Sequence, residues 1–369
     1  MHIATMIDHQ RFRDERGWFN RTVVGLVSAG VQVTRVVPEE NSDDQRVSLT
    51  ASIRMEPSAM PWARRSCLES VAAQLKTGGV SLIHAMGRGV WRDAVEVGAR
   101  AGCPVVFDIW SAGDVRYAVK LSKSDGVSGI FASTSGLADE LRRYIDPALV
   151  CTIPIGVHLS EEGKSLFGDG EQGEMGETDP QPVAVLAGSG AKLEHLYAII
   201  DGFAGMRAEQ SGCMLFADID SSNSGKVWAR AQKRGILDGF SMIPSVDLHR
   251  RLVMKADILL MPATSGRSSS FTLEAMAGLM VPVMVRDERV SQPPDKIAAC
   301  LLDDPKAEDW QRVLREIVAD PVKSCAIARE ARNWVAREHR MSGQISDTYD
   351  AYEMVLTGGS VRLDPGRAG

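Results

Sequence analysis

The stretch ADILLMPATSGRSSSFTLEAMAGLMVPVMVR, Ala256–Arg286, contains the pattern that decides the fold. Its apolar run Ile258–Met261 has the length of a buried strand, and a loop of small and hydroxyl residues follows at Pro262–Ser270. Phe271–Met280 has a helical pattern, and Val281–Val285 is a second extended run. The stretch therefore predicts a strand, a loop, a helix and a parallel strand, which together form one crossover unit.

The start of this predicted helix carries candidate ligand-binding residues. Ser268, Ser269 and Ser270 fall where the first backbone N–H groups of a helix lack intrahelical partners, and such a helix start favours a phosphate. Glu274, one turn further on, could accept hydrogen bonds from ribose hydroxyls. The alternative is a plain N-capped core helix with a surface glutamate, which the local pattern also fits.

Composition limits the class of protein. The chain has 369 residues, enough for two domains of ordinary size, and 44% of them are hydrophobic and 24% charged. A net charge of −6 argues against a nucleic-acid binder, and no apolar run approaches the ~20 residues that span a bilayer. The chain starts on a strand pattern without a signal-peptide core, and its six cysteines lie far apart. We therefore expect a cytoplasmic protein with reduced thiols.

Strands and helices alternate along the first half of the chain. The expected strands are Ile3–Ile7, Val31–Val37, Leu49–Ile53, Val80–His84, Cys103–Trp110, Val127–Ala132 and Leu149–Pro154. The expected helices are Phe19–Ser28, Ala63–Leu75, Arg92–Ala101 and Gly136–Tyr144. A polar loop is expected at His9–Arg16. This rhythm predicts a doubly wound parallel sheet.

The second half repeats the alternation after a boundary. Leu159–Pro182 is acidic, rich in glycine and poor in apolar residues, so we interpret it as a linker or surface insertion. Beyond it we expect strands at Val183–Ala187, Cys213–Ala217 and Phe240–Ile243 and helices at Leu193–Met206, Ser224–Arg234, Leu248–Lys255, Trp310–Val318 and Val322–Leu356. Two doubly wound domains, at 1–158 and 183–340, predict a cleft between two sets of strand carboxyl ends, where ligands bind in such sheets. Residues 357–369 read as a disordered tail.

Three segments of the second half carry a family resemblance: VAVLAGSGAKLEHLYAIIDGFAGM, RGILDGFSMIPSVDLHRRLVMKADILLMPA and FTLEAMAGLMVPVMVRD. They resemble segments of family 4 glycosyltransferases, which have the GT-B fold. VCTIPIGVHL is similar to the family's inter-domain segment, and SDTYDAYEMVL to the C-terminal helix, here 341–356, that crosses back to the first domain. Looser matches are MIDHQRFRDERGWFNRTVVGLVSAGVQVTRVVP, SLIHAMGRG and CPVVFDIW. The resemblance implies two Rossmann-like domains and a nucleotide-sugar donor, with no further cofactor.

The sequence departs from the family at its working residues. Glu274 matches the glutamate that holds the nucleotide ribose, whereas the family's other glutamate, which touches the donor sugar, falls on Gly266. Ser189 stands in place of the arginine that holds the diphosphate, and Lys192 replaces the lysine with shorter spacing. Trp110 stands where many members carry a histidine near the reacting centre, so that proton-exchanging role is lost unless another residue supplies it.

The resemblance implies one donor-binding set on two loops. It consists of Gly188, Ser189, Gly190 and Lys192 on one side of the diphosphate, Arg267, Ser268, Ser269 and Ser270 on the other, Glu274 at the ribose and Gly266 at the donor sugar. Arg267 could compensate for the missing arginine, because a guanidinium forks well onto phosphate; the alternative is a solvated loop residue. In retaining glycosyl transfer such a cluster would stabilise the leaving diphosphate.

Two further positions bear on catalysis. His84 ends a predicted strand and is a candidate catalytic residue, the alternative being a structural histidine. Asp218 and Asp220 form an acid pair after a strand, of the kind that holds a cation in metal-dependent transferases. Because the family resemblance does not use this strand for metal, we interpret the pair as a polar strand end and expect no bound metal.

The acceptor side is less defined. Arg16, Gly17 and Trp110 fall where the family's acceptor approaches. A second group consists of Met60, Trp62, Arg64 and Arg65. It could allow weak peripheral contact with the inner face of a membrane, but we prefer the alternative, an ordinary loop and helix start.

Two functions from different classes follow. The first is a glycosyltransferase that transfers a sugar from a nucleotide-sugar donor to an unknown acceptor, such as a glycan, a lipid or a small molecule. The second is a catalytically inactive homologue that binds a nucleotide or acts as a scaffold or regulatory protein. The family resemblance, Glu274 and Lys192 support the first, which we prefer. The substitutions at Gly266, Ser189 and Trp110 are the grounds for the second. The sequence leaves the sugar, the nucleotide base and the oligomeric state open.

Overall fold

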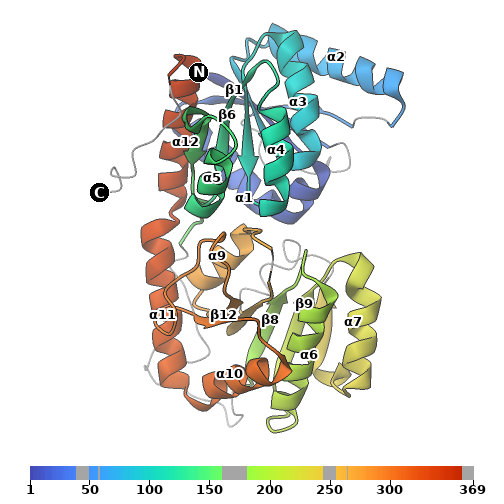
Figure 1. The fold of residues 1–369 in the computed structure, drawn as a ribbon, viewed down its shortest axis with the longest axis vertical. Coiled ribbons are helices and arrows are strands. Elements are labelled where there is room, and N and C mark those ends of the chain that lie inside the picture. The colour runs from blue at the N-terminus through green and yellow to red at the C-terminus, as the bar shows by residue number, and fades with distance from the viewer. Residues whose placement is uncertain (39–49, 57–58, 160–180, 244–254, 264, 360–369) are drawn as a thin grey trace. The chain divides into compact units, whose positions relative to one another are not determined.

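A computed structural model describes residues 1–38, 50–56, 59–159, 181–243, 255–263 and 265–359. The chain forms two compact units (Figure 1). Unit 1 comprises Met1–Gly156 and Met341–Gly369, and unit 2 comprises Val157–Arg340. The interior of the predicted linker, most of the helix predicted at Leu248–Lys255 and the end of the predicted tail lie outside the described residues.

Unit 1 is built on a seven-stranded parallel sheet with the order β3–β2–β1–β4–β5–β6–β7. The strands are β1 (His2–Ile7), β2 (Gln32–Val37), β3 (Ala51–Arg54), β4 (Leu82–Met86), β5 (Val105–Ile109), β6 (Val127–Ala132) and β7 (Val150–Thr152). The helices are α1 (His9–Ser28), α2 (Pro61–Thr77), α3 (Arg88–Ala101), α4 (Val115–Leu121), α5 (Ser135–Arg142) and α12 (Met341–Leu356). The strand order reverses between β1 and β4, as the predicted doubly wound sheet requires.

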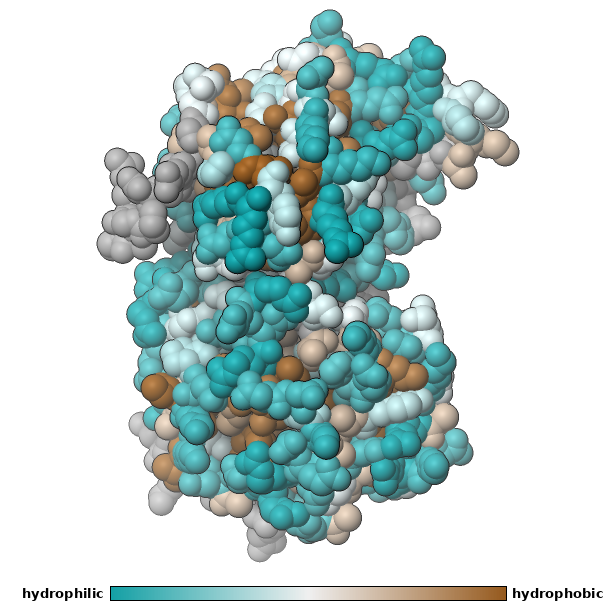
Figure 2. Space-filling model, in the orientation of Figure 1, coloured by the Kyte–Doolittle hydropathy of each residue, from teal (hydrophilic) through white to brown (hydrophobic). Residues whose placement is uncertain are grey.

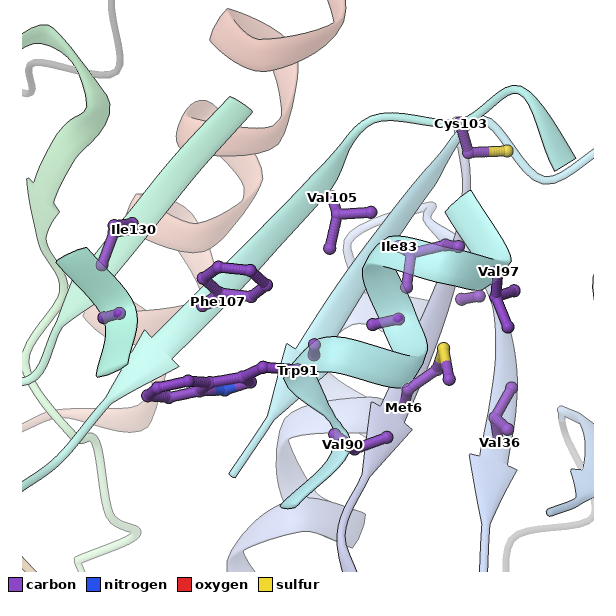
Figure 3. Packing of buried hydrophobic residues seen from close by; sticks show 14 of the residues in the cluster. Met6, Val36, Ile83, Val90, Trp91, Val97, Cys103, Val105, Phe107 and Ile130 are labelled. Carbon is purple, nitrogen blue, oxygen red and sulfur yellow. The ribbon is translucent and has the colours of Figure 1, made fainter. Parts of the chain in front are cut away.

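The core of unit 1 lies between this sheet and its covering helices. Every residue of β4 and β5 is buried, because both strands lie inside the sheet with helices on its faces. Figure 3 shows Trp91 of α3 packed against Phe107 of β5, with the two rings stacked at a centroid distance of 5.3 Å. Neither side chain is exposed to solvent, so together they fix α3 on the sheet.

Helix α1 corrects one expectation. His9–Arg16 was expected to be a polar loop, but the helix begins at His9, immediately after β1. The Asp8 carboxylate caps it by accepting the Arg11 N–H at 2.6 Å, and Phe12 supplies a buried side chain in the first turns. The expectation was wrong because the polar residues of this segment are compatible with an amphipathic helix, which kinks at Glu15 (φ −132°).

The C-terminal helix returns to the first unit, as predicted. Tyr352 of α12 is fully buried, Ile345 packs against Gly25 of α1, and Trp18 of α1 donates to Gln344 at 3.0 Å. The predicted helical region Val322–Leu356 consists of two helices, α11 (Pro321–Glu338) and α12, with the break at His339–Arg340.

Unit 2 is built on a six-stranded parallel sheet with the order β10–β9–β8–β11–β12–β13. The strands are β8 (Val183–Ala187), β9 (Met214–Asp218), β10 (Phe240–Ile243), β11 (Ile258–Met261), β12 (Val281–Val285) and β13 (Cys300–Leu302). The helices are α6 (Leu193–Arg207), α7 (Ser221–Lys233), α9 (Ser270–Ala277), α10 (Ala307–Ala319) and α11. The segment Ala256–Arg286 contains β11, α9 and β12 as predicted, and β11 pairs with β12 in parallel.

The core of unit 2 includes a close contact between α6 and α10. A side chain at Gly202 of α6 would place its Cβ 2.6 Å from the Ala307 carbonyl oxygen and 2.6 Å from the Trp310 Cβ. Trp310 is buried, so the small residue on α6 lets the large residue on α10 fill the interface.

The visible face of the molecule is mostly hydrophilic, with apolar side chains showing in patches (Figure 2). Within the described ranges, no helix combines the length and apolar character needed to cross a membrane. The six cysteines are free thiols.

Candidate functional site

A cavity of about 450 Å³ lies in unit 2. Its lining residues are Lys192, His195, Ala263, Ser265, Arg286, Asp287, Glu288 and Arg289. These residues follow β8, β11 and β12, which are neighbours in the sheet, and the strand order reverses between β8 and β11. The cavity therefore lies at the carboxyl ends of the strands and at the switch point, where doubly wound sheets bind ligands.

The glycine turn after β8 forms one border of this region. A Cβ at Gly188 would lie 2.8 Å from Leu196, and Gly190 has φ +80°, so both positions favour glycine. The Asp220 carboxylate accepts the Gly190 N–H at 2.7 Å and the Ser189 hydroxyl at 3.0 Å. An internal carboxylate thus occupies the backbone donor that sequence analysis assigned to a phosphate.

The loop after β11 has a similar arrangement. Gly266 (φ +76°) donates its N–H to Asp287 at 2.7 Å, and Asp287 also accepts the backbone N–H of Arg289 at 3.1 Å. The Arg289 guanidinium donates twice more to Asp287, at 2.9 and 3.0 Å. Burial pushes the pKa of Asp287 upward, but the hydrogen bonds from Arg289 and Gly266 outweigh it, and this pKa is lowered overall.

Helix α9 begins one residue earlier than predicted, at Ser270. Ser269 is its N-cap and accepts the Phe271 N–H at 3.2 Å, while Ser268 and Ser270 are buried. Glu274 is only 8% exposed, so the alternative that it is a surface glutamate is wrong. A carboxylate one turn inside α9 is therefore shielded from bulk water.

Arg267 brings the two loops together. Its Nη1 atom lies 3.0 Å from the position that a Cβ at Gly190 would take, so the guanidinium packs against the turn after β8. Arg267 is half-buried, unlike the solvated loop residue of the alternative interpretation. Lys192, on the same turn, is 69% exposed with Nζ 3.9 Å from Glu194.

The charges that line the cavity are partly balanced within the unit. Lys192, Arg286 and Arg289 face two acids, Asp287 and Glu288, so the lining carries one more cation than anion. Arg286 pairs outside the lining set with Asp295 at 3.0 Å and Asp303 at 2.9 Å. Because Arg286 and Arg289 are ion-paired with acids of unit 2, an anionic ligand at this site would rely mainly on Lys192 and Arg267.

His84 lies in β4 of unit 1, where the geometry favours the structural alternative. Its Nδ1 lies 2.6 Å from the Tyr352 hydroxyl, and its ring packs edge-on against Phe131. Burial, reinforced by the charge of Arg11, lowers the pKa of His84 to about 3. The imidazole is therefore neutral at physiological pH and contacts the C-terminal helix.

The predicted acceptor-side residues lie near a buried network in unit 1. Trp110 is 5% exposed, contacts Trp18 edge-on at 4.5 Å and has the Arg11 guanidinium carbon 3.3 Å from its ring centroid. Arg11 also pairs with Asp108 at 3.1 Å. What Trp110 does toward an acceptor stays a prediction.

The other two acceptor-side residues, Arg16 and Gly17, lie inside α1. The Arg16 guanidinium carbon is 5.7 Å from the Phe12 ring centroid. Gly17 therefore lies in a helical turn, and the polar loop that sequence analysis placed before it does not form.

The predicted membrane-contact group lies at the start of α2. Met60 and Trp62 are 59% and 74% exposed. Arg64 pairs with Asp93 and Glu96, and Arg65 pairs with Glu69. These arginines are balanced within unit 1, and the membrane contact stays a prediction.

Asp218 and Asp220, the acid pair at the end of β9, both accept hydrogen bonds from the glycine turn after β8. Asp218 ends the strand and its backbone carbonyl accepts the Gly188 N–H at 2.9 Å, while Asp220 holds the glycine turn. Among the described residues, no three His, Cys, Asp or Glu side chains are grouped so as to hold a metal ion. The sequence pattern predicted the polar strand end but not the bond from Asp220 to the turn.

Comparison with solved structures gives the fold. A glycosyltransferase from Rickettsia africae aligns over 97% of this chain and 99% of its own, with a TM-score of 0.72 and 11% identity. Anabaena HepE in complex with UDP-glucose aligns over 95% and 99%, with a TM-score of 0.72 and 11% identity. This chain has the GT-B fold.

A third GT-B structure, sucrose-phosphate synthase from Thermosynechococcus elongatus, aligns over 97% of this chain and 100% of its own, with a TM-score of 0.71 and 14% identity. No family model and no curated protein matches the sequence. At these identities the likeness concerns the GT-B fold, and the chemistry has to be argued from the chain's own residues.

Proposed function

We propose that this GT-B chain is a glycosyltransferase that takes a sugar from a nucleotide-diphosphate donor. The observation that carries the proposal is the cavity at the carboxyl ends of β8, β11 and β12, beside which Arg267 packs on the Gly190 turn. A nucleoside diphosphate sugar has the matching chemistry, since its phosphates need fixed cations and its sugar needs polar contacts. HepE, which shares the fold, was crystallised with UDP and with UDP-glucose.

Each part of the site has a proposed role. Arg267 and Lys192 bind the diphosphate and stabilise the charge that develops on it as the sugar leaves. Glu274 accepts hydrogen bonds from the ribose, and its burial in α9 strengthens them by excluding water. Retention of anomeric configuration follows from the family 4 resemblance. The acceptor is a glycan, a lipid or a small molecule.

We also propose that the transfer needs no bound metal. Asp220, one of the two acids that a metal-dependent site would use, accepts hydrogen bonds from Gly190 and Ser189. Two cations beside the cavity, Arg267 and Lys192, take over the neutralisation of the diphosphate. Donor turnover measured with and without EDTA tests this, and loss of turnover in EDTA would contradict it.

A specific observation favours the second candidate, a homologue that binds a nucleotide without turning it over. The N–H groups of Gly190 and Gly266 are both taken by internal carboxylates. Such a protein would bind the nucleotide diphosphate and gain nothing from the attached sugar.

One experiment separates the two candidates. Titration calorimetry with uridine, guanosine and adenosine diphosphates and their sugar derivatives measures binding, and release of free sugar measures turnover. A transferase binds one sugar nucleotide and turns it over, and Glu274→Gln abolishes turnover. The matched control is Glu338→Gln on the exposed face of α11, which leaves it unchanged. Binding without turnover supports the second candidate, and turnover that survives Glu274→Gln contradicts the role of that residue.

A further inference from the structure

Asp220 occupies a helix-capping position without capping the helix. It is the N-cap residue of α7, with the extended backbone (φ −53°, ψ 141°) that such residues adopt. An N-cap aspartate ordinarily accepts the backbone N–H two or three residues on, here Ser222 or Asn223. Its side chain accepts no such bond, and instead reaches the turn after β8.

The bonds that Asp220 makes are those of an anion in a phosphate site. One carboxylate oxygen accepts the Gly190 N–H at 2.7 Å, and the other accepts the Ser189 hydroxyl at 3.0 Å. A backbone N–H and a hydroxyl on a glycine turn at a strand's carboxyl end are donors that phosphate oxygens use. Arg267 lies against the same glycine. The two carboxylate oxygens therefore occupy the positions that two oxygens of a phosphate would take at these donors.

The other internal carboxylate, Asp287, behaves differently. Its two oxygens accept four N–H groups, one from Gly266 and three from Arg289. Four donors fill the acceptor positions of a carboxylate, so Asp287 is a fixed part of its loop. The Asp220 carboxylate accepts two hydrogen bonds, from Gly190 and Ser189, and it belongs to the N-cap residue of α7, whose first-turn N–H groups are the donors that such a carboxylate usually meets. One of these groups, the Asn223 N–H, also donates to the Asp220 backbone carbonyl at 2.9 Å.

We propose that Asp220 is an internal substitute for phosphate, which a diphosphate ligand displaces from the Gly190 turn. On displacement the carboxylate rotates to cap α7, so part of its lost bonding is regained at the helix N-terminus. The proposal rests on the donor site proposed above. It makes Asp220 the residue that weakens diphosphate binding and so keeps the leaving nucleotide from being held too tightly.

Asp220→Ser tests this directly, since a serine is still a good N-cap but carries no charge and is too short to reach the turn after β8. Binding of inorganic pyrophosphate to the full chain is measured by titration calorimetry for the wild type and for Asp220→Ser. The matched control is Asp320→Ser at the N-cap of α11, where the aspartate accepts the Lys323 N–H at 3.0 Å. We expect Asp220→Ser to bind at least tenfold more tightly and Asp320→Ser to match the wild type.

Equal or weaker binding by Asp220→Ser, or no binding by either protein, overturns the proposal. Because loss of the turn contact could also unfold the loop, Asp220→Asn is measured beside it. Asp220→Asn keeps an oxygen for the Gly190 N–H and removes the charge. We expect its affinity for pyrophosphate to lie between those of the wild type and Asp220→Ser. An affinity equal to that of the wild type counts against the proposal. Pyrophosphate contains no sugar, so this test does not depend on donor turnover. If Asp220→Ser binds pyrophosphate more tightly but the protein turns over no donor, this inference stands and the proposed transferase function fails.

Discussion

Replacement of Arg267 by alanine gives the sharpest test of how the diphosphate is held. The half-buried guanidinium lies against Gly190 and beside the cavity, so its removal takes away a forked cationic donor. A hydrogen bond to a charged group contributes about 1.5–3 kcal/mol. We therefore expect the Kd for the nucleoside diphosphate to rise about 10- to 150-fold.

The assay is titration calorimetry with the nucleoside diphosphate that the wild type binds best, repeated with Arg267→Lys and Arg312→Ala. Lysine keeps the charge but loses the fork, so we expect an intermediate Kd. Arg312 is 56% exposed on α10 and pairs with Glu316, so its removal should change the Kd less than twofold. An Arg267→Ala protein that binds the nucleotide as tightly as the wild type would refute the reasoning.

Two further predictions concern the framework. Gly202→Ala should lower the free energy of unfolding by about 1–3 kcal/mol, because the added Cβ would overlap Ala307 and Trp310. Gly225→Ala in α7 should raise it by about 0.5–1 kcal/mol, because a Cβ there would have no atom within 4 Å and alanine favours the helix. Urea denaturation measures both, and shifts of the same sign would contradict the packing of α6 on α10. The lowered pKa of His84, about 3, means that the unfolded chain takes up this proton first as pH falls below about 6.5, so folding stability declines toward pH 3. His84→Gln should remove about 2 kcal/mol of the stability difference between pH 7 and pH 5, and an unchanged difference would show that another group titrates.

The strands could be predicted from the sequence because buried parallel strands are short apolar runs. Val183–Ala187, Ile258–Met261 and Val281–Val285 have the predicted bounds. The start of α1 was missed because polarity was taken as a loop signal, although Asp8 and Phe12 supply a cap and a buried face. β13 has three residues and α4 seven, and elements this short leave little periodicity to detect.

Lys192, Arg267, Glu274 and the glycines could be named as candidate site residues from the sequence. The cavity residues Arg286, Asp287 and Arg289 were missed, and Asp220 was interpreted only as part of a polar strand end. Asp220 binds Gly190 across 30 residues, and Asp287 binds Gly266 across 21, and such pairings depend on which strands lie side by side. The sequence did indicate the position of both acids, because each follows a strand of the same sheet and so lies at the edge where the glycine turns lie. The contacts themselves depend on the strand order, which the sequence did not specify.

The central claim is that a diphosphate binds in unit 2 at the carboxyl ends of β8, β11 and β12. A crystal structure of the protein with a bound nucleoside diphosphate tests it most directly. The account predicts phosphate oxygens within hydrogen-bonding distance of the Arg267 guanidinium and the Gly190 N–H, with Asp220 turned toward α7. A nucleotide bound elsewhere, or phosphates that leave Arg267 uncontacted, would contradict it.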